Sequence, residues 1–213
     1  MIRDWLVDLD NCLYPYDNGL YHHINEKMND YISINLNVAQ NKVNQIRKSF
    51  IRTYGSTLLG LILHHQIDAN DFLNCTHDIP LDQYIVEDLY LTNFIKEHLQ
   101  GKLFIFTNAP GFYASKVIRL LGIEEWVEEV FDIYFTAFEG KPYEKAFRKV
   151  IHHTGILPHE TLFIDDMKNN ILTARKLGFP TIHIDTSIPF ENNYYNDLFI
   201  PMVKQKLKVS EVI

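Results

Sequence analysis

The chain has 213 residues, 46% of them hydrophobic and 22% charged, which is enough to bury the core of one globular unit with a modest insertion. The formal net charge of −7 argues against a nucleic acid polymer or an anionic membrane as the main partner, because both require clustered Lys and Arg. No uninterrupted apolar run approaches the roughly 20 residues that span a bilayer, so no membrane span is predicted.

The number of cysteines is informative about the cellular compartment of the protein. Cys12 and Cys75 cannot make a disulfide framework, and the first residues lack the charged and then apolar pattern of a secretion signal. We therefore expect a reducing, cytoplasmic location. A small phosphorylated metabolite is compatible with this acidic chain, because a metal ion and a few local donors can reverse the potential inside one cleft.

The first predicted element is a short strand that ends in two carboxylates. The apolar run at 5–7 leads to Asp8 and Asp10, and open parallel sheets bind ligands outside the carboxyl ends of their strands. Residues two apart on a strand point to opposite faces, so these acids can share one metal ion only if the chain leaves strand geometry at Leu9 or Asp10. The turn-forming Asn11 favours such a departure.

A helical region is predicted between residues 20 and 100. Apolar residues recur at steps of four over 21–36, and the helical spacing continues until Gly55 interrupts it. A further apolar run follows at 58–63, and the segment 86–99 returns to a helical pattern. Because no strand pattern interrupts the region, we expect several packed helices.

Residues 101–213 alternate between strands and helices. Strands are predicted at 102–107, 130–135, 161–164 and 181–184, and helices at 113–121, 143–153 and 168–177. Such alternation is typical of an α/β fold with a doubly wound parallel sheet, a Rossmann-like core. We predict a core of residues 1–15 and 101–213, with residues 16–100 inserted after the first strand as a helical cap. Four aromatics of the tail are expected to dock on the core: Phe190, Tyr194, Tyr195 and Phe199.

Four short motifs carry a family resemblance. The run Asp8-Leu9-Asp10-Asn11-Cys12-Leu13-Tyr14 resembles the nucleophile loop of the haloacid dehalogenase-like hydrolases, and its last five residues resemble the branch that contains pyrimidine 5′-nucleotidases. The other motifs follow in the family's order: Phe104-Ile105-Phe106-Thr107-Asn108, Gly140-Lys141-Pro142, and Phe163-Ile164-Asp165-Asp166 with Asn170 behind. Cys12 departs from the Thr of most members, although Cys looks usual in the nucleotidase-like branch.

These motifs contain four carboxylates, Asp8, Asp10, Asp165 and Asp166, with no Cys or His set beside them. Oxygen donors favour a hard cation that keeps its waters, so we expect Mg²⁺ before Zn²⁺ as the cofactor. The resemblance implies that Asp8 attacks phosphorus and binds the metal ion, that Asp10 contributes its backbone carbonyl, and that Asp165 completes the ligands. Asp166 would then be an alternative or more distant ligand. The Asp10 side chain is left to protonate the leaving oxygen and later to take a proton from water.

Three further residues are expected to bind the phosphoryl group. Thr107 ends a predicted strand with a hydroxyl, and Asn108 leads into a helix whose first amides are unpaired donors suited to phosphate. Lys141 can neutralise both the nucleophile and the phosphate. Each also has a plainer interpretation, because Thr and Asn favour helix caps and Gly-Lys-Pro is common in surface turns. The three His-His pairs point in different directions on predicted helices, so we do not expect them to bind metal.

The helical insertion is expected to choose the substrate, because the motifs can bind only metal and phosphate. Tyr54 and Thr57 flank a break between two apolar helices, where an aromatic ring and a hydroxyl would suit a pyrimidine base. Arg47 could add a charge. The alternative is a simple interhelical turn with Tyr54 packed beneath it.

We predict a Mg²⁺-dependent phosphomonoesterase that acts through an aspartyl-phosphate on Asp8. The expected substrate is a nucleoside 5′-monophosphate, pyrimidine before purine. One alternative is a phosphatase of another small metabolite, such as a sugar phosphate or phosphoglycolate. The other is a non-catalytic relative that binds a phospholigand. The sequence does not define the oligomeric state.

Overall fold

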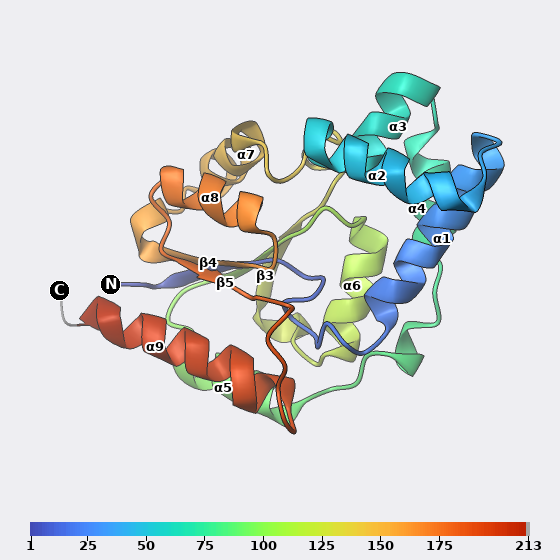
Figure 1. Ribbon diagram of the computed structural model, residues 1–213. Helices are drawn as coiled ribbons and strands as arrows, with labels where there is room; N and C mark the ends of the chain where they lie inside the picture. Colours follow the sequence, from blue (N-terminus) through green and yellow to red (C-terminus); the bar gives the residue numbers. More distant parts are fainter. Residues whose placement is uncertain (212–213) are drawn as a thin grey trace.

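Five parallel strands form the centre of the molecule, in the order β3-β2-β1-β4-β5. The computed structural model describes residues 1–211, and its strands are β1 (Asp4–Val7), β2 (Leu103–Phe106), β3 (Val127–Phe131), β4 (Thr161–Asp165) and β5 (Thr181–His183). Strands β2 and β4 are buried along their whole length because helices cover both faces of the sheet (Figure 1). The predicted α/β fold with a doubly wound, Rossmann-like sheet is confirmed.

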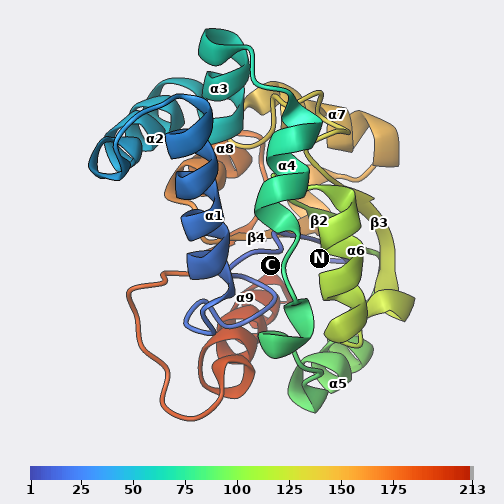
Figure 2. The same ribbon diagram turned by 90° about the vertical axis from the view of Figure 1, so that its right-hand side faces the viewer.

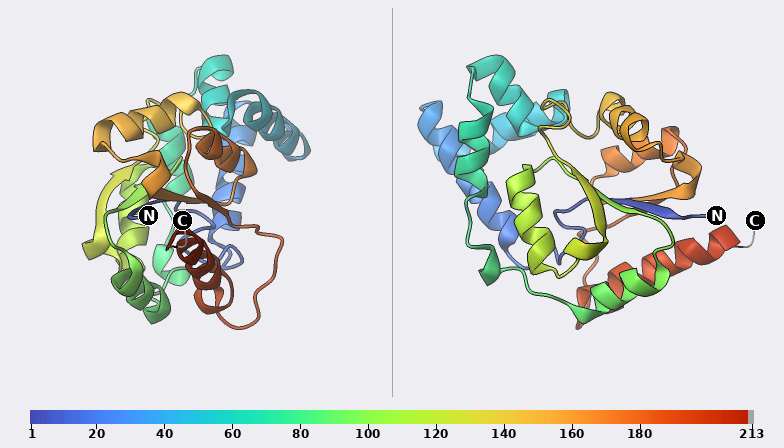
Figure 3. Two further views of the ribbon diagram at one scale, coloured as in Figure 1. Left: turned by 90° about the vertical axis from the view of Figure 1, so that its left-hand side faces the viewer. Right: turned by 180° about the vertical axis from the view of Figure 1, so that it is seen from behind.

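Helices α7 and α8 cover one face of the sheet, and α5, α6 and α9 cover the other. Their bounds are α5 (Leu89–His98), α6 (Gly111–Leu120), α7 (Glu144–Thr154), α8 (Lys168–Lys176) and α9 (Ile200–Glu211). Side chains alternate between these faces: Leu6 and Phe163 pack with the first group, Trp5 and Ile105 with the second. Figure 3 shows α5 and α9 side by side. Short 3-10 turns lie at Leu81–Gln83, Glu124–Trp126 and Pro158–Glu160, and a π-helical turn at Tyr195–Phe199.

The edge strand β3 differs from its prediction. It runs over Val127–Phe131 and not over 130–135. An edge strand is paired on one side only and can begin within an acidic stretch, a composition that by itself predicts exposed surface. Asp132 then ends the strand, because its carboxylate accepts the amide hydrogens of Gly111 at 2.7 Å and Phe135 at 2.8 Å.

Four helices, which we call the cap, stand over one end of the sheet (Figure 2). They are α1 (Leu20–Asn35), α2 (Gln40–Tyr54), α3 (Thr57–His65) and α4 (Ala69–His77). Their apolar faces form a separate core from Tyr31, Ile32, Val43, Leu58, Leu61, Phe72 and Leu73. No helix among the described residues has the length and apolar character needed to cross a bilayer.

Helix α5 packs against the sheet and not with the cap. The Phe94 ring lies 5.7 Å from the Trp5 ring, measured between centroids. The sequence pattern places this helix within the cap segment 16–100, but periodicity does not tell which surface an apolar face will cover. We propose that the cap comprises residues 20–77 and that α5 belongs to the core.

The tail after β5 docks on the loop that follows β1, in line with its aromatic composition. Tyr194 and Tyr195 are buried and donate hydrogen bonds to the carbonyl oxygens of Cys12 at 2.8 Å and Leu13 at 2.7 Å. The other two tail aromatics pack in the same apolar cluster. The tail therefore supports the backbone of the 8–14 loop.

Candidate active site

The site lies at the end of β1, from which the sheet extends through β2 and β3 on one side and through β4 and β5 on the other. Strand β1 has β2 on one side and β4 on the other, and Val7 pairs with Ile105 and Ile164 of these neighbours. Asp8 and Asp165 therefore emerge together at the carboxyl edge of the sheet, and the Asp8 amide donates to the Ile164 carbonyl oxygen at 2.9 Å. Open α/β sheets bind their ligands at this kind of position.

The chain leaves strand geometry directly after Asp8, as predicted. The Leu13 amide donates to the Leu9 carbonyl oxygen at 3.0 Å, and Asn11 adopts a left-handed backbone with φ of 59°. Asn tolerates this conformation better than most residues. The resulting turn places Asp10 on the wall of the same pocket as Asp8.

Lys141 is buried between two carboxylates. Its Nζ lies 2.9 Å from Oδ1 of Asp8 and 2.6 Å from Oδ2 of Asp165, and 2% of the residue is exposed. Burial alone would lower the pKa of this ammonium group, but the two carboxylates raise the pKa above its ordinary value. Lys141 therefore keeps a positive charge next to Asp8.

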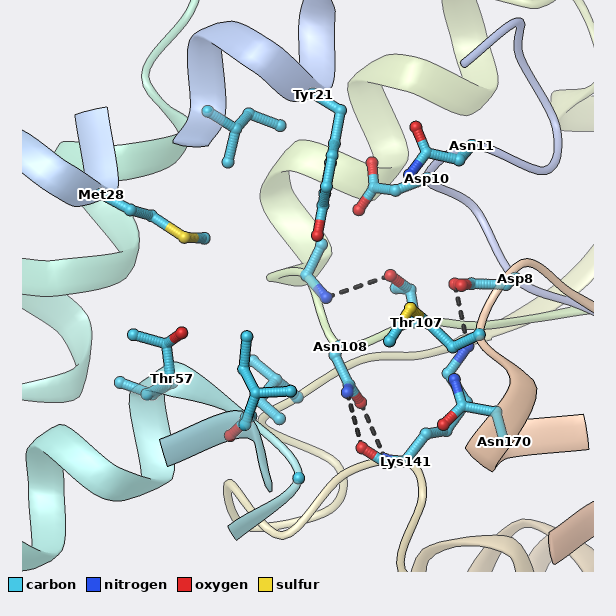
Figure 4. Close-up of a pocket in the computed structure, with 18 of the residues that line it drawn as sticks. Asp8, Asp10, Asn11, Tyr21, Met28, Thr57, Thr107, Asn108, Lys141 and Asn170 are labelled. Atoms are coloured by element: carbon cyan, nitrogen blue, oxygen red, sulfur yellow. Dashed lines mark hydrogen bonds and ion pairs between the residues drawn. The ribbon is translucent and has the colours of Figure 1, made fainter. Parts of the chain in front are cut away.

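Asn108 holds the backbone of Lys141 in place. Its Nδ2 donates to the Lys141 carbonyl oxygen at 2.8 Å, and the Lys141 amide donates to its Oδ1 at 2.8 Å (Figure 4). Gly140 permits this contact, because a Cβ there would lie 2.1 Å from Oδ1 of Asn108. The Asn108 side chain is thus engaged with the backbone of Lys141, and the predicted contact of the amides at this position with phosphate stays a prediction.

Asp165 has its oxygens occupied by protein groups. The carboxylate is fully buried and accepts hydrogen bonds from Lys141 Nζ, from the Met167 amide at 2.8 Å and from Asn170 Nδ2 at 2.8 and 3.0 Å. These contacts use both oxygens. Asp165 thus contacts Lys141 directly, and the metal-ligand role that the sequence suggests for it stays a prediction.

Asp166 turns toward the 8–14 loop instead, where its Oδ2 accepts a hydrogen bond from Asn11 Nδ2 at 3.1 Å. A ligand atom from each of Asp8, Cys12 and Asp166 lies within 4.8 Å of the other two. Burial raises the pKa of Asp8 well above its usual range, with Lys141 opposing, and burial and the charge of Asp165 raise the pKa of Asp166 to about 6. Burial also raises the pKa of the Cys12 thiol, which stays protonated. The crowded carboxylates therefore fit a hard cation bound through oxygen.

Asp10 and Thr107 also line the pocket. Oδ1 of Asp10 accepts hydrogen bonds from the hydroxyl groups of Tyr14 at 2.6 Å and Tyr113 at 2.7 Å. The Thr107 Oγ1 accepts the Ala109 amide hydrogen at 3.0 Å, which leaves its own hydrogen to be donated. Sequence reasoning missed both tyrosines, because one is a motif residue without an assigned role and the other belongs to an apolar helix face.

A pocket of about 180 Å³ extends from these groups toward the cap (Figure 4). Its walls away from the carboxylates are mostly apolar and are formed by Ile24, Met28, Ile51, Leu58, Phe72, Leu73 and Ile133. Two polar residues without a sequence signal, Tyr21 and His77, also line it. Burial lowers the pKa of His77, which keeps this imidazole neutral.

Two of the three cap residues predicted to contact the substrate line the pocket, namely Arg47 and Thr57. Tyr54 does not line it, and its hydroxyl pairs with Nε2 of His64 near the surface of the cap. The Arg47 guanidinium is turned toward α1, where it donates to Oδ1 of Asn29 at 2.7 Å and to other groups of that helix. Arg47 thus links α2 to α1 through neutral partners only, and its predicted charge contact with a substrate stays a prediction.

The fold and the site together define an α/β enzyme that places the Lys141 ammonium group and several carboxylates at the carboxyl edge of its sheet. The chain belongs to the haloacid dehalogenase-like (HAD-like) hydrolases, because the family model for haloacid dehalogenase-like hydrolases matches residues 6–178. Hydrolases of this family use Mg²⁺.

Individual relatives resemble the chain at lower identity. Phosphate metabolism protein 8 of Saccharomyces cerevisiae is 25% identical over 205 residues, which cover 88% of this chain and 63% of that protein. The chain therefore spans less than two thirds of that relative's length. A predicted HAD-like family hydrolase from Porphyromonas gingivalis has a TM-score of 0.60 and 20% identity, with 98% of each chain covered. A HAD family enzyme of Bacteroides thetaiotaomicron, solved as a mutant in complex with magnesium and inorganic phosphate, has a TM-score of 0.52 and 19% identity over 86% of this chain and 94% of that one.

Proposed function

We propose that the protein is a Mg²⁺-dependent phosphomonoester hydrolase that acts through an aspartyl-phosphate on Asp8. The observation that carries this proposal is the buried Lys141 ammonium between Asp8 and Asp165, at the base of a pocket. A carboxylate attacks a phosphate only if a cation screens their mutual repulsion. Oδ1 of Asp8 accepts from Lys141 and from the Leu9 amide at 2.7 Å, so Oδ2 is the oxygen left to attack.

The remaining pocket groups have separate tasks in this reaction. Oδ2 of Asp8 bonds to phosphorus while the ester P–O bond breaks, and Asp10 protonates the departing oxygen. The Thr107 hydroxyl donates to a phosphoryl oxygen. In the second half, Asp10 takes a proton from the water that attacks phosphorus, and the Asp8–phosphorus bond breaks to release phosphate.

The groups proposed to hold Mg²⁺ are Asp166, the backbone carbonyl of Asp10 and Oδ1 of Asp8, which would exchange one of its two protein donors for the ion while Oδ2 attacks. When bound there, the ion screens the charge of the carboxylates and of the phosphate. Asp166 takes the place of Asp165 in this assignment, because Asp165 has both oxygens in contact with protein donors.

Activation by Mg²⁺ is expected to weaken in acid. The pKa of Asp166, raised by burial to about 6, lies above the ordinary aspartate value, so the metal-free protein takes up this proton as the pH falls through about 6. Mg²⁺ requires the ionised carboxylates of Asp166 and Asp8, and burial raises the pKa of Asp8 as well, so the half-activating Mg²⁺ concentration should rise by at least about tenfold per pH unit below that point. Mg²⁺ titrations of phosphate release at several pH values measure this concentration. A constant value across the acid range would contradict the ligand role of Asp166.

For the substrate we propose a nucleoside 5′-monophosphate, pyrimidine before purine. This preference is supported by the resemblance of the 8–14 loop and by the mostly apolar pocket walls, which suit a flat base. A sugar phosphate or phosphoglycolate would place hydroxyl or carboxylate groups against the same walls. A non-catalytic role has less support, because the nucleophile, the lysine and the acid are all present at the pocket.

Thr57 is expected to contribute to recognition of the nucleotide, whereas Tyr54 is not. Thr57 lines the pocket and Tyr54 lies outside it. Thr57→Ala should raise the KM for the nucleotide several-fold and leave the KM for a small aryl phosphate nearly unchanged. Tyr54→Ala is the matched control from the same interhelical break and should change neither. Equal effects of Thr57→Ala on both substrates would argue that this residue only supports the cap.

A panel of phosphorylated metabolites tests the function as a whole. Pyrimidine and purine nucleoside monophosphates, sugar phosphates, phosphoglycolate and an aryl phosphate are assayed for phosphate release, with Mg²⁺ and with excess chelator. We expect release that requires Mg²⁺ and is fastest with a pyrimidine nucleotide. Full activity in chelator would contradict the metal assignment, and a faster sugar phosphate would replace the nucleotide assignment.

A further inference from the structure

The carboxylate of Asp10 is held by two tyrosines from different parts of the chain. Tyr14 ends the 8–14 loop and Tyr113 lies in α6, and both side chains are fully buried. Their hydroxyl oxygens lie 2.6 and 2.7 Å from the same oxygen, Oδ1 of Asp10, and 3.2 Å from each other. We call Tyr14 and Tyr113 the tyrosine pair.

The number of hydroxyl hydrogens determines which of these three contacts are hydrogen bonds. A tyrosine hydroxyl has one hydrogen, and a carboxylate oxygen accepts through two lone pairs. If both hydroxyls donate to Asp10, the lone pairs of Oδ1 are filled and the 3.2 Å contact between the hydroxyls is not a hydrogen bond. Within the described part of the chain no donor lies on Oδ2, although Asp10 lines the pocket.

Oδ2 is consequently the oxygen of Asp10 that can carry a transferable proton. Protonation of Oδ1 would use one of its two lone pairs and so break one of the two hydrogen bonds that it accepts from the tyrosine hydroxyls. Rotation of the carboxylate would break both contacts. The cap adds a further constraint, because the His77 ring packs edge-on against the Tyr113 ring with a centroid separation of 5.1 Å.

We propose that Tyr14 and Tyr113 are positioning residues that act through Asp10 by keeping Oδ1 occupied and Oδ2 directed at the leaving-group oxygen. The inference rests on the proposed phosphomonoesterase function. In the first half of the reaction the proton on Oδ2 passes to the ester oxygen as its bond to phosphorus breaks. In the second half the same oxygen accepts a proton from the attacking water.

Turnover of esters whose leaving groups differ in basicity distinguishes this positioning role from simple support of the fold. An alkyl leaving oxygen needs the proton, whereas the oxygen of an activated aryl phosphate such as 4-nitrophenyl phosphate needs it much less. Tyr14→Phe and Tyr113→Phe should each lower kcat for the alkyl ester about tenfold, with kcat for the aryl ester within about twofold and KM unchanged. In an Asp10→Asn background neither change should lower kcat further, because both act through the same carboxylate.

Tyr195→Phe is the matched control. It removes a buried tyrosine hydroxyl that donates to the Leu13 carbonyl oxygen of the same loop at 2.7 Å but does not touch Asp10. We expect it to lower Tm and to leave the ratio of alkyl to aryl turnover unchanged. The alkyl ester in these assays is the best substrate of the metabolite panel.

Two results would overturn the inference. Equal losses on both esters, or a further loss in the Asp10→Asn background, would show that the tyrosine pair only supports the fold. These outcomes differ from a failure of the proposed function, in which the wild-type protein itself releases no phosphate from any ester. Because the two tyrosines come from separate elements, either variant alone is sufficient for the test, with Tm as the check on folding.

Discussion

Asp8→Asn is expected to leave less than a few per cent of wild-type phosphate release while the protein stays folded. A neutral amide cannot attack phosphorus as a carboxylate does. The amide oxygen can still accept the Leu9 amide hydrogen that now lies 2.7 Å from Oδ1 of Asp8, and Lys141 keeps its contact with Asp165 at 2.6 Å. Removal of one of several crowded carboxylates also relieves repulsion, so we expect no decrease in Tm.

The measurements for this variant are turnover on the best substrate of the panel and Tm. Asp4→Asn is a suitable control because Asp4 belongs to the same strand at its other end, where Oδ1 accepts the Lys102 amide hydrogen at 2.8 Å. That control should retain wild-type activity. Substantial turnover by Asp8→Asn would place the nucleophile elsewhere and would remove the basis of the proposed mechanism.

Lys141→Met is expected to abolish turnover and also to destabilise the protein. The ammonium group lies within 2.9 Å of Asp8 and 2.6 Å of Asp165, and both carboxylates are buried. Removing one partner of a buried ion pair leaves uncompensated charge and costs about 3–5 kcal/mol of unfolding free energy. Activity is lost separately, because no other cationic side chain among the described residues contacts Asp8 and helps the proposed Mg²⁺ to screen the attack on phosphate.

A double variant separates these two effects. Lys141→Met combined with Asp165→Asn removes the charge of the carboxylate in closest contact with the lysine, so denaturant unfolding should show that much of the lost stability returns. Turnover should stay absent. Recovery of activity in the double variant would contradict a direct electrostatic role for Lys141, and an unchanged stability in the single variant would contradict the buried ion pair.

Local patterns along the chain were sufficient to predict the sheet apart from its edge strand β3, and the edge of the sheet at which Asp8 and Asp165 lie. The buried runs before Asp8 and Asp165 have the composition of central strands, and their carboxyl ends must meet in a parallel sheet. The edge strand β3 was less predictable, because its one-sided pairing permits an acidic stretch that resembles surface. The packing of α5 against the sheet could not be predicted from the sequence either, since its apolar face would suit the cap or the sheet equally well.

The individual roles within the site depended on contacts between distant segments. The sequence of the Asp165-Asp166 pair does not indicate which of the two carboxylates Lys141 will contact. That choice depends on how the loop that contains Gly140 packs against the end of β4. Tyr54 and Thr57 are three positions apart in the sequence, yet of the two only Thr57 lines the pocket.

By itself the sequence determined the fold class, the family resemblance and the set of chemical groups at the site, because these follow from residue types and from periodicity along one segment. The tertiary structure alone decided which oxygen of Asp8 contacts Lys141, which aspartate lies close to Asp8 and Cys12, and which tyrosines hold Asp10. Each of those outcomes depends on side-chain distances between segments as far apart as 8–14 and 113, and such distances are set by packing.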